Sequence, residues 1–85
     1  MGTREQLQEW LGKKVSLEAV AEKGHRLTGQ IQKNPIKDIS EFCITYNITK
    51  DLVFYEHLII GNIEKIDKKA KKIYTKKRMG GSIYQ

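Results

Sequence analysis

The fold is decided by the stretch VSLEAVAEKGHRLTGQI, residues 15–31. Apolar side chains occupy every second position over 15–19, and the alternation resumes over 27–31. A period of two is typical of half-buried strands, so the stretch predicts two of them. The polar break that ends in Gly24 predicts the turn of a hairpin. Because glycine weakens the interior of a strand, Gly29 predicts a sharp bend or a close backbone approach.

The same stretch resembles the first signature of the Sm/Lsm/Hfq family of small RNA-binding barrels. In that family, alternating hydrophobic residues precede a glycine, four residues, a second glycine, one residue and an aliphatic side chain. The corresponding positions here are Val15, Leu17, Gly24, Gly29 and Ile31. The resemblance implies a small barrel that binds RNA and assembles into a homo-oligomeric ring.

The N-terminal region predicts a short helix over about residues 3–12. Thr3 and Gln6 have the spacing of a capping box, in which each side chain satisfies an early backbone amide. Gly12 stands where such a helix would end. Because a helix of about two turns does not persist alone in water, we expect its apolar side chains to dock on the sheet. These side chains are Leu7, Trp10 and Leu11.

The middle of the chain predicts two more strands. A loop begins at Asn34-Pro35, because proline cannot donate to a sheet, and we expect it to run to about Ser40. Alternation over 42–46 predicts a third strand, and residues 47–51 read as a turn. The strongly apolar run over 52–60 continues the sheet.

The elements after residue 60 have two interpretations. In the first, the run over 59–66 resembles the second Sm-family signature, an aliphatic-Arg-Gly-Asn run before the last strand, with Ile60 at the arginine position. In the second, 61–66 and 72–75 are separate strands joined at 67–71. The end of the chain is also similar to the end of YolD-like proteins, in the run GNIEKID followed by KI at Lys72.

Both interpretations predict the same fold class. We expect a mainly-β protein, a small five-stranded SH3/Sm-like barrel with a short N-terminal helix. The barrel and helix would form one domain over residues 1–79, followed by a flexible C-terminal tail over 80–85. Eighty-five residues leave room for only a modest core, so oligomerisation would add stability.

The positive charge is concentrated at one end of the chain. Residues 1–60 carry eight Lys/Arg and eight Asp/Glu, so they are neutral as a whole. Residues 61–85 carry eight Lys/Arg and two Asp/Glu, and therefore hold the entire formal charge of +6. A one-sided basic block commonly contacts polyanions, nucleic acid first and anionic membranes second.

These features predict non-enzymatic binding of RNA or single-stranded nucleic acid, by electrostatic attraction and aromatic stacking. The residues expected to contact it are Lys65, Lys68, Lys69, Lys71, Lys72, Tyr74, Lys76, Lys77 and Arg78, with Gly61 and Asn62 from the Sm-like signature. The competing hypothesis is a protein-interaction module that uses a sheet edge or an aromatic patch, with lysines that only solubilise the chain.

Catalysis and cofactors are not expected. Cys43 and His57 form the only pair that suggests a nucleophile, and a strand cysteine is usually a small buried hydrophobe. His57 beside Glu56 reads as a polar surface position. One cysteine and two histidines are too few to suggest a metal site. The single cysteine and the lack of an apolar run of membrane-spanning length predict a cytoplasmic protein with no membrane partner.

Overall fold

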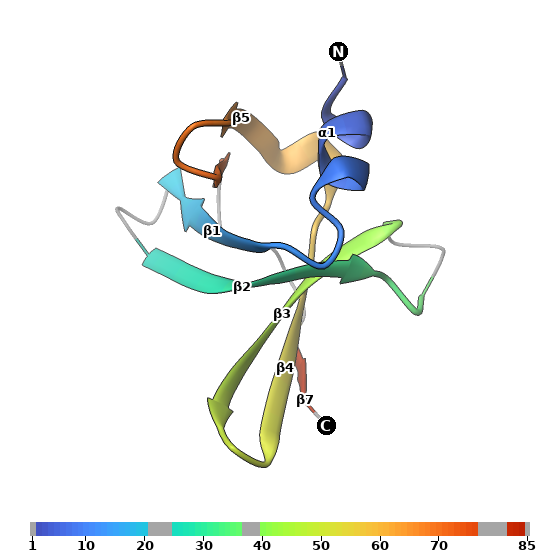
Figure 1. Cartoon of the computed structure of the whole chain (residues 1–85), viewed down its shortest axis with the longest axis vertical. Coiled ribbons are helices and arrows are strands. Elements are labelled where there is room, and N and C mark those ends of the chain that lie inside the picture. The colour runs from blue at the N-terminus through green and yellow to red at the C-terminus, as the bar shows by residue number, and fades with distance from the viewer. Residues whose placement is uncertain (1, 21–24, 37–39, 77–81, 85) are drawn as a thin grey trace.

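The computed structural model describes residues 2–20, 25–36, 40–76 and 82–84. They form a mainly-β fold with one short helix, as the sequence predicts (Figure 1). The elements in chain order are α1 (Thr3–Glu9), β1 (Lys14–Ala19), β2 (His25–Lys33), β3 (Phe42–Thr49), β4 (Leu52–His57), the 3₁₀ turn η2 (Ile60–Asn62), β5 (Ile63–Asp67), β6 (Lys72–Thr75) and β7 (Ser82–Tyr84).

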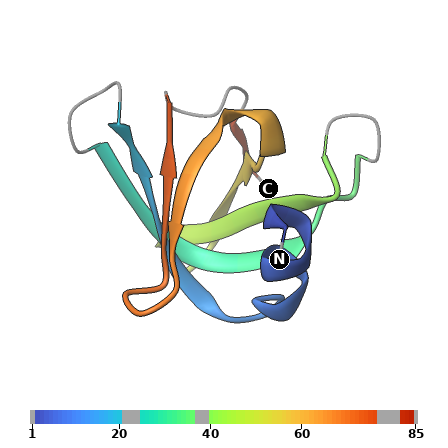
Figure 2. The same ribbon diagram turned by 90° about the horizontal axis from the view of Figure 1, so that it is seen from above.

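The strands form one mixed sheet of seven, in the order β5-β6-β1-β2-β3-β4-β7. All neighbours are antiparallel except β1 and β6, which are parallel. The sheet is strongly curved, and Figure 2 shows the long strands β2 and β3 bending around one side of the molecule. Because β5 and β7 are the edges of this order, closure into a five-stranded barrel stays a prediction.

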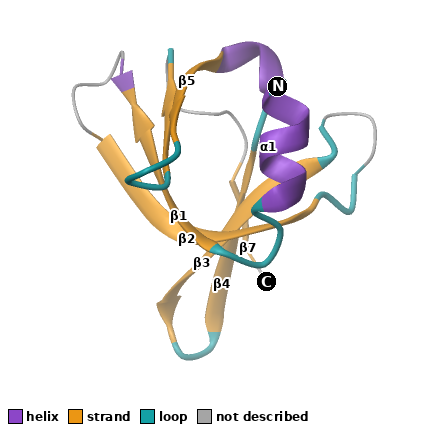
Figure 3. Cartoon of the chain, turned by 45° about the horizontal axis from the view of Figure 1, so that its top comes forward, coloured by secondary structure: helices purple, strands orange, loops and turns teal. Residues whose placement is uncertain are grey.

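One core cluster holds the curved sheet and the helix together. The alternating positions of β1 are buried as predicted, and Leu17 is 3% exposed. Figure 3 shows α1 lying alongside the sheet, where Leu7 and Trp10 are buried and Leu11 packs against the core. The predicted docking of the helix is therefore confirmed. The buried core residues are Leu7, Trp10, Val15, Leu17, Ile31, Phe42, Ile44, Leu58 and Ile73.

Gly29 marks the place where β2 changes partners. It is the register partner of Val15 on β1, and the next residue, Gln30, pairs with Thr45 on β3. A Cβ atom at position 29 would collide with the backbone carbonyl oxygen of Thr45. The predicted close backbone approach is confirmed, and it allows the sheet to curve at this point.

The predicted capping box is wrong. The helix is capped by Gly2 without a side-chain hydrogen bond, and it ends at Glu9 rather than near residue 12. Gln6 is turned toward the interior, where it is 4% exposed and its amide nitrogen donates to Glu9 Oε1 at 3.3 Å. Gly12 follows the helix in the left-handed region, with a φ of +79°.

Two segments differ from the sequence prediction. Most of the predicted turn at 47–51 is strand, because β3 runs to Thr49 through the β-branched residues 48 and 49, and the register shifts between Asn47 and Thr49. Part of the predicted flexible tail at 80–85 forms β7, which pairs with the outer edge of β4. An exposed strand edge offers unpaired backbone groups to such a segment. The predicted turn at Gly24 lies outside the described residues.

The two separate strands of the second interpretation are confirmed, but the first of them is Ile63–Asp67 rather than 61–66, because Gly61 and Asn62 belong to η2. β5 and β6 are separate antiparallel strands, and Asp67 pairs with Lys72 on either side of the turn at 68–71. β6 also pairs with β1, so the hairpin extends the sheet beyond its first strand. This arrangement places the lysine-rich part of the chain at one edge of the sheet.

Candidate nucleic-acid interface

The β5–β6 hairpin carries most of the predicted contact residues. Lys77 and Arg78 lie outside the described residues. The other predicted cations lie on the hairpin or directly after it: Lys65, Lys68, Lys69, Lys71, Lys72 and Lys76.

The strand register sorts the hairpin into an apolar and a charged face. Ile66 pairs with Ile73, which is fully buried and belongs to the core. Lys65 pairs with Tyr74, one position away from that apolar pair. Because side chains alternate along a strand, Lys65, Lys72 and Tyr74 lie on the face turned away from the core.

Two of these lysines lie close to the ring of Tyr74. The Nζ atom of Lys65 lies 4.9 Å from the centre of the Tyr74 ring, and that of Lys72 lies 6.0 Å away. An ammonium group is attracted to the negative face of an aromatic ring at such distances. Tyr74 therefore holds two cations close together, and its predicted stacking on a base stays a prediction.

The carboxylate of Glu18 on β1 partly offsets the positive charge of this cluster. Its Oε1 atom lies 3.7 Å from Nζ of Lys72 and 4.0 Å from Nε of Arg26. A single carboxylate thus faces cations from two neighbouring strands. The outer face of the hairpin and of β1 keeps a net positive charge around Tyr74.

The turn at 68–71 has a defined backbone conformation. The carboxylate of Asp67 accepts a hydrogen bond from the backbone N–H of Ala70 at 3.1 Å. The backbone N–H of Ser16 on β1 donates to the carbonyl of Lys71 at 2.9 Å. Lys71 itself has a φ of +53°, the left-handed region that costs a non-glycine residue about 1 kcal/mol. These bonds tie the turn to β1 and keep Lys69 and Lys71 exposed beside it.

Gly61 and Asn62 lie at the other end of the hairpin. They belong to η2, which enters β5, and the carbonyl of Asn62 accepts a hydrogen bond from the N–H of Lys76 at 2.9 Å. The structure therefore brings Asn62 and Lys76 together. The turn that carries the other lysines lies at the opposite end of the hairpin, as Figure 2 shows.

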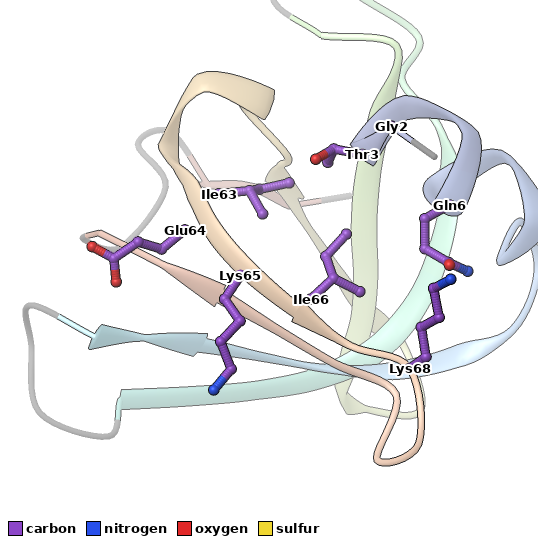
Figure 4. A pocket seen from close by; sticks show the side chains of 8 residues that line it. All are labelled: Gly2, Thr3, Gln6, Ile63, Glu64, Lys65, Ile66 and Lys68. Atoms are coloured by element: carbon purple, nitrogen blue, oxygen red, sulfur yellow. The ribbon is translucent and has the colours of Figure 1, made fainter.

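A cavity of about 290 Å³ lies between α1 and β5. Figure 4 shows Lys68 extending toward Gln6 across this cavity. The Oε1 atom of Gln6 is buried there, with no hydrogen-bond partner among the residues that the structure describes. Sequence reasoning missed this cavity because it depends on how the helix packs beside an edge strand 60 residues further along the chain. The lining residues are Gly2, Thr3, Gln6, Ile63, Glu64, Lys65, Ile66 and Lys68.

Cys43 and His57 are neighbours, but the thiol is poorly suited to catalysis. They are register partners on β3 and β4, and the thiol is fully buried. Burial raises the pKa of Cys43 to about 11, so at neutral pH it is a protonated thiol rather than a nucleophilic thiolate. The Nδ1 atom of His57 lies 2.9 Å from the side-chain nitrogen of Asn34.

The predicted surface position of His57 and Glu56 is wrong. His57 is 5% exposed and Glu56 is 1% exposed. The reason is that this end of β4 lies among core residues, because Glu56 and His57 are the register partners of the fully buried Ile44 and Cys43 on β3. Within the described ranges, no group of three or more His, Cys, Asp or Glu side chains is placed to hold a metal ion.

No family model, no curated protein and no solved structure matches this chain. In the part of the chain that the structure describes, no helix has the length and apolar character needed to cross a membrane. The assignment of function therefore depends on the charge and geometry of the described residues.

Proposed function

We propose that this protein binds RNA, or single-stranded nucleic acid more generally, and that it does so without catalysing a reaction. The observation that carries the proposal is the concentration of five lysines on one edge hairpin. Three of them lie at its turn, and the other two converge on Tyr74. A surface of this kind neutralises several consecutive phosphates and releases their counterions.

The fold suits this role. We propose that the curved sheet and its helix act as an open form of the small SH3/Sm-like barrel, with the β5–β6 hairpin as a projecting edge. The same edges, β5 and β7, provide a route to the predicted homo-oligomer, because an edge strand presents unpaired backbone groups to a second copy. The single free thiol, Cys43, accords with a reducing compartment, and we place the protein in the cytoplasm.

Binding is expected to weaken steeply as salt rises. For single strands, each neutralised phosphate contributes about −0.7 to the slope of log K against log salt concentration. Fluorescence anisotropy with labelled single-stranded RNA and DNA oligomers, from about 50 to about 300 mM salt, measures this slope. We expect a straight line with a slope of about −3.5 or steeper for the unmodified protein, about 0.7 for each of the five lysines. Undetectable binding at the lowest salt would refute the proposal.

A second function, that of a protein-interaction module, is favoured by the α1–β5 cavity. It lies beside an edge strand and contains the buried, unpartnered amide oxygen of Gln6. An extended peptide added to β5 would meet both features. This function predicts no binding of oligonucleotides at any salt concentration, so the same titration separates the two.

A further inference from the structure

The cavity between α1 and β5 borders the basic hairpin. Its volume is about 290 Å³, at the lower end of the range of ligand pockets, so it suits an occupant the size of one nucleotide rather than a larger molecule. Gly2, Thr3 and Gln6 line it on the side of α1 (Figure 4). Lys65 and Lys68 line it on the other side, and both also belong to the proposed phosphate-binding surface. A strand held by the hairpin lysines can therefore reach the cavity.

The amide of Gln6 has a fixed orientation at the wall of the cavity. Gln6 is 4% exposed, and its Nε2 atom donates to Oε1 of Glu9 at 3.3 Å. An ionised carboxylate only accepts hydrogen bonds, so the amide nitrogen has to face Glu9 and the amide oxygen is left for another donor. The Oε1 atom of Gln6 is buried and has no hydrogen-bond partner in the part of the chain that the structure describes. Because such an atom costs free energy, it is suited to accept a hydrogen bond from a ligand.

Lys68 faces Gln6 across the cavity. Lys68 is exposed in the turn after β5, and Figure 4 shows its side chain extending toward the amide of Gln6. Its ammonium group does not donate to this amide, because Oε1 of Gln6 lacks a partner among the described residues. A phosphate at the hairpin attracts the ammonium group outward, and the flexible lysine side chain can follow. That movement would open the cavity to a base as a strand binds.

Two aliphatic side chains of β5 form the apolar wall of the cavity. Ile63 and Ile66 line it, are half-buried and pack against the core. Figure 4 shows both side chains directed toward α1. Glu64 points away from α1, so its carboxylate does not face the interior of the cavity. Apolar walls with a few placed polar groups are typical of small-ligand sites. The flat face of a base can pack on the two isoleucines, with its polar edge turned toward Gln6.

We propose that this cavity holds one base of the bound strand, and that Gln6 selects a base with an exocyclic amino group. The amino groups of adenine and cytosine can donate to Oε1 of Gln6. Guanine and uracil carry a carbonyl oxygen at the corresponding place, which the same atom repels. This inference rests on the proposed function and adds base selectivity to it. The hairpin lysines alone do not provide selectivity, because phosphate contacts carry no sequence information.

An isosteric pair of ligands tests the proposal on the unmodified protein. One is labelled oligoadenylate. The other is an oligomer of the same length whose bases are purine, which differs from adenine only by the missing amino group. Fluorescence anisotropy at about 50 mM salt should show that oligoadenylate binds about tenfold more tightly, because the purine oligomer leaves Oε1 of Gln6 without a donor.

Gln6→Leu, with Gln8→Leu as its matched control, tests the role of Gln6. Gln8 lies on the same helix, is exposed and does not line the cavity. We expect the Gln6→Leu variant to lose the preference for oligoadenylate and the Gln8→Leu variant to keep it. Because Gln6→Leu removes a buried oxygen that has no partner among the described residues, its melting temperature should not fall. A preference that persists in a folded Gln6→Leu variant would overturn the assignment.

The outcomes separate the base pocket from the proposed function. Salt-dependent binding of both oligomers to the unmodified protein with equal affinity would overturn the base pocket and leave the proposed function standing. No binding of either oligomer at low salt would refute both, and would leave the cavity to the extended peptide of the second function.

Discussion

Replacing Gly29 by alanine is expected to destabilise the protein by about 3 kcal/mol, at the upper end of the cost of overpacking a close contact. The new Cβ atom would overlap the backbone carbonyl oxygen of Thr45, and a backbone group cannot swing aside as a side chain can. Relief requires β2 and β3 to separate at the point where their pairing begins. For a chain of this size, we expect a fall in melting temperature of roughly 12–24 °C.

Gly61→Ala is the matched control for this prediction. No atom lies within 4 Å of a Cβ added at Gly61, so its melting temperature should change little. Thermal unfolding followed by circular dichroism compares the two variants directly. A Gly29→Ala variant as stable as the Gly61→Ala variant would show that the sheet does not need the close approach at Gly29.

Replacing five lysines of the hairpin by glutamine is expected to weaken nucleic-acid binding at low salt about a hundredfold or more. The formal charge of the whole chain falls from +6 to +1. The backbone of the hairpin should survive, because its stability depends on the buried Ile73, the Asp67–Ala70 bond and pairing with β1. The substituted residues are Lys65, Lys68, Lys69, Lys71 and Lys72. Anisotropy titrations at about 50 mM salt measure the loss.

Glu18→Gln is the opposing control. Its carboxylate faces Lys72 and Arg26, so its removal leaves both cations without a competing anion. We expect tighter binding of the same oligomer, by a few-fold, with a steeper salt dependence. Weaker binding by the Glu18→Gln variant would mean that Glu18 positions the contact residues rather than opposing the ligand.

Much of the fold follows from local patterns in the sequence. The period of two over 15–19 depends only on which side chains face the core, and the structure buries the alternating positions. Gly29 was informative because only a few physical needs explain a glycine inside a strand, chiefly a bend or a close backbone approach. The predicted start of the helix was less accurate. A capping box is only a local preference, and in the structure Gln6 is buried instead of capping the helix. β7 was missed because its pairing with β4 depends on an edge far away in the sequence.

The residues of the candidate site also include some that the sequence predicts and some that only the structure reveals. The lysines of the hairpin are visible as a run of like charges between two short strands. Glu18 was not predicted, because its relevance comes from β6 pairing parallel to β1. Glu18 does occupy an outward position in the first alternating strand, and that pattern is the signal by which it could have been found.

The most direct test of the central claim is the salt dependence of binding by the unmodified protein and by the five-lysine variant, measured on one single-stranded oligomer. If the β5–β6 hairpin is the phosphate-binding surface, the slope of log K against log salt concentration becomes less steep by about 3.5 in the variant, about 0.7 for each lysine. Equal slopes and equal affinities in the two proteins would contradict the account.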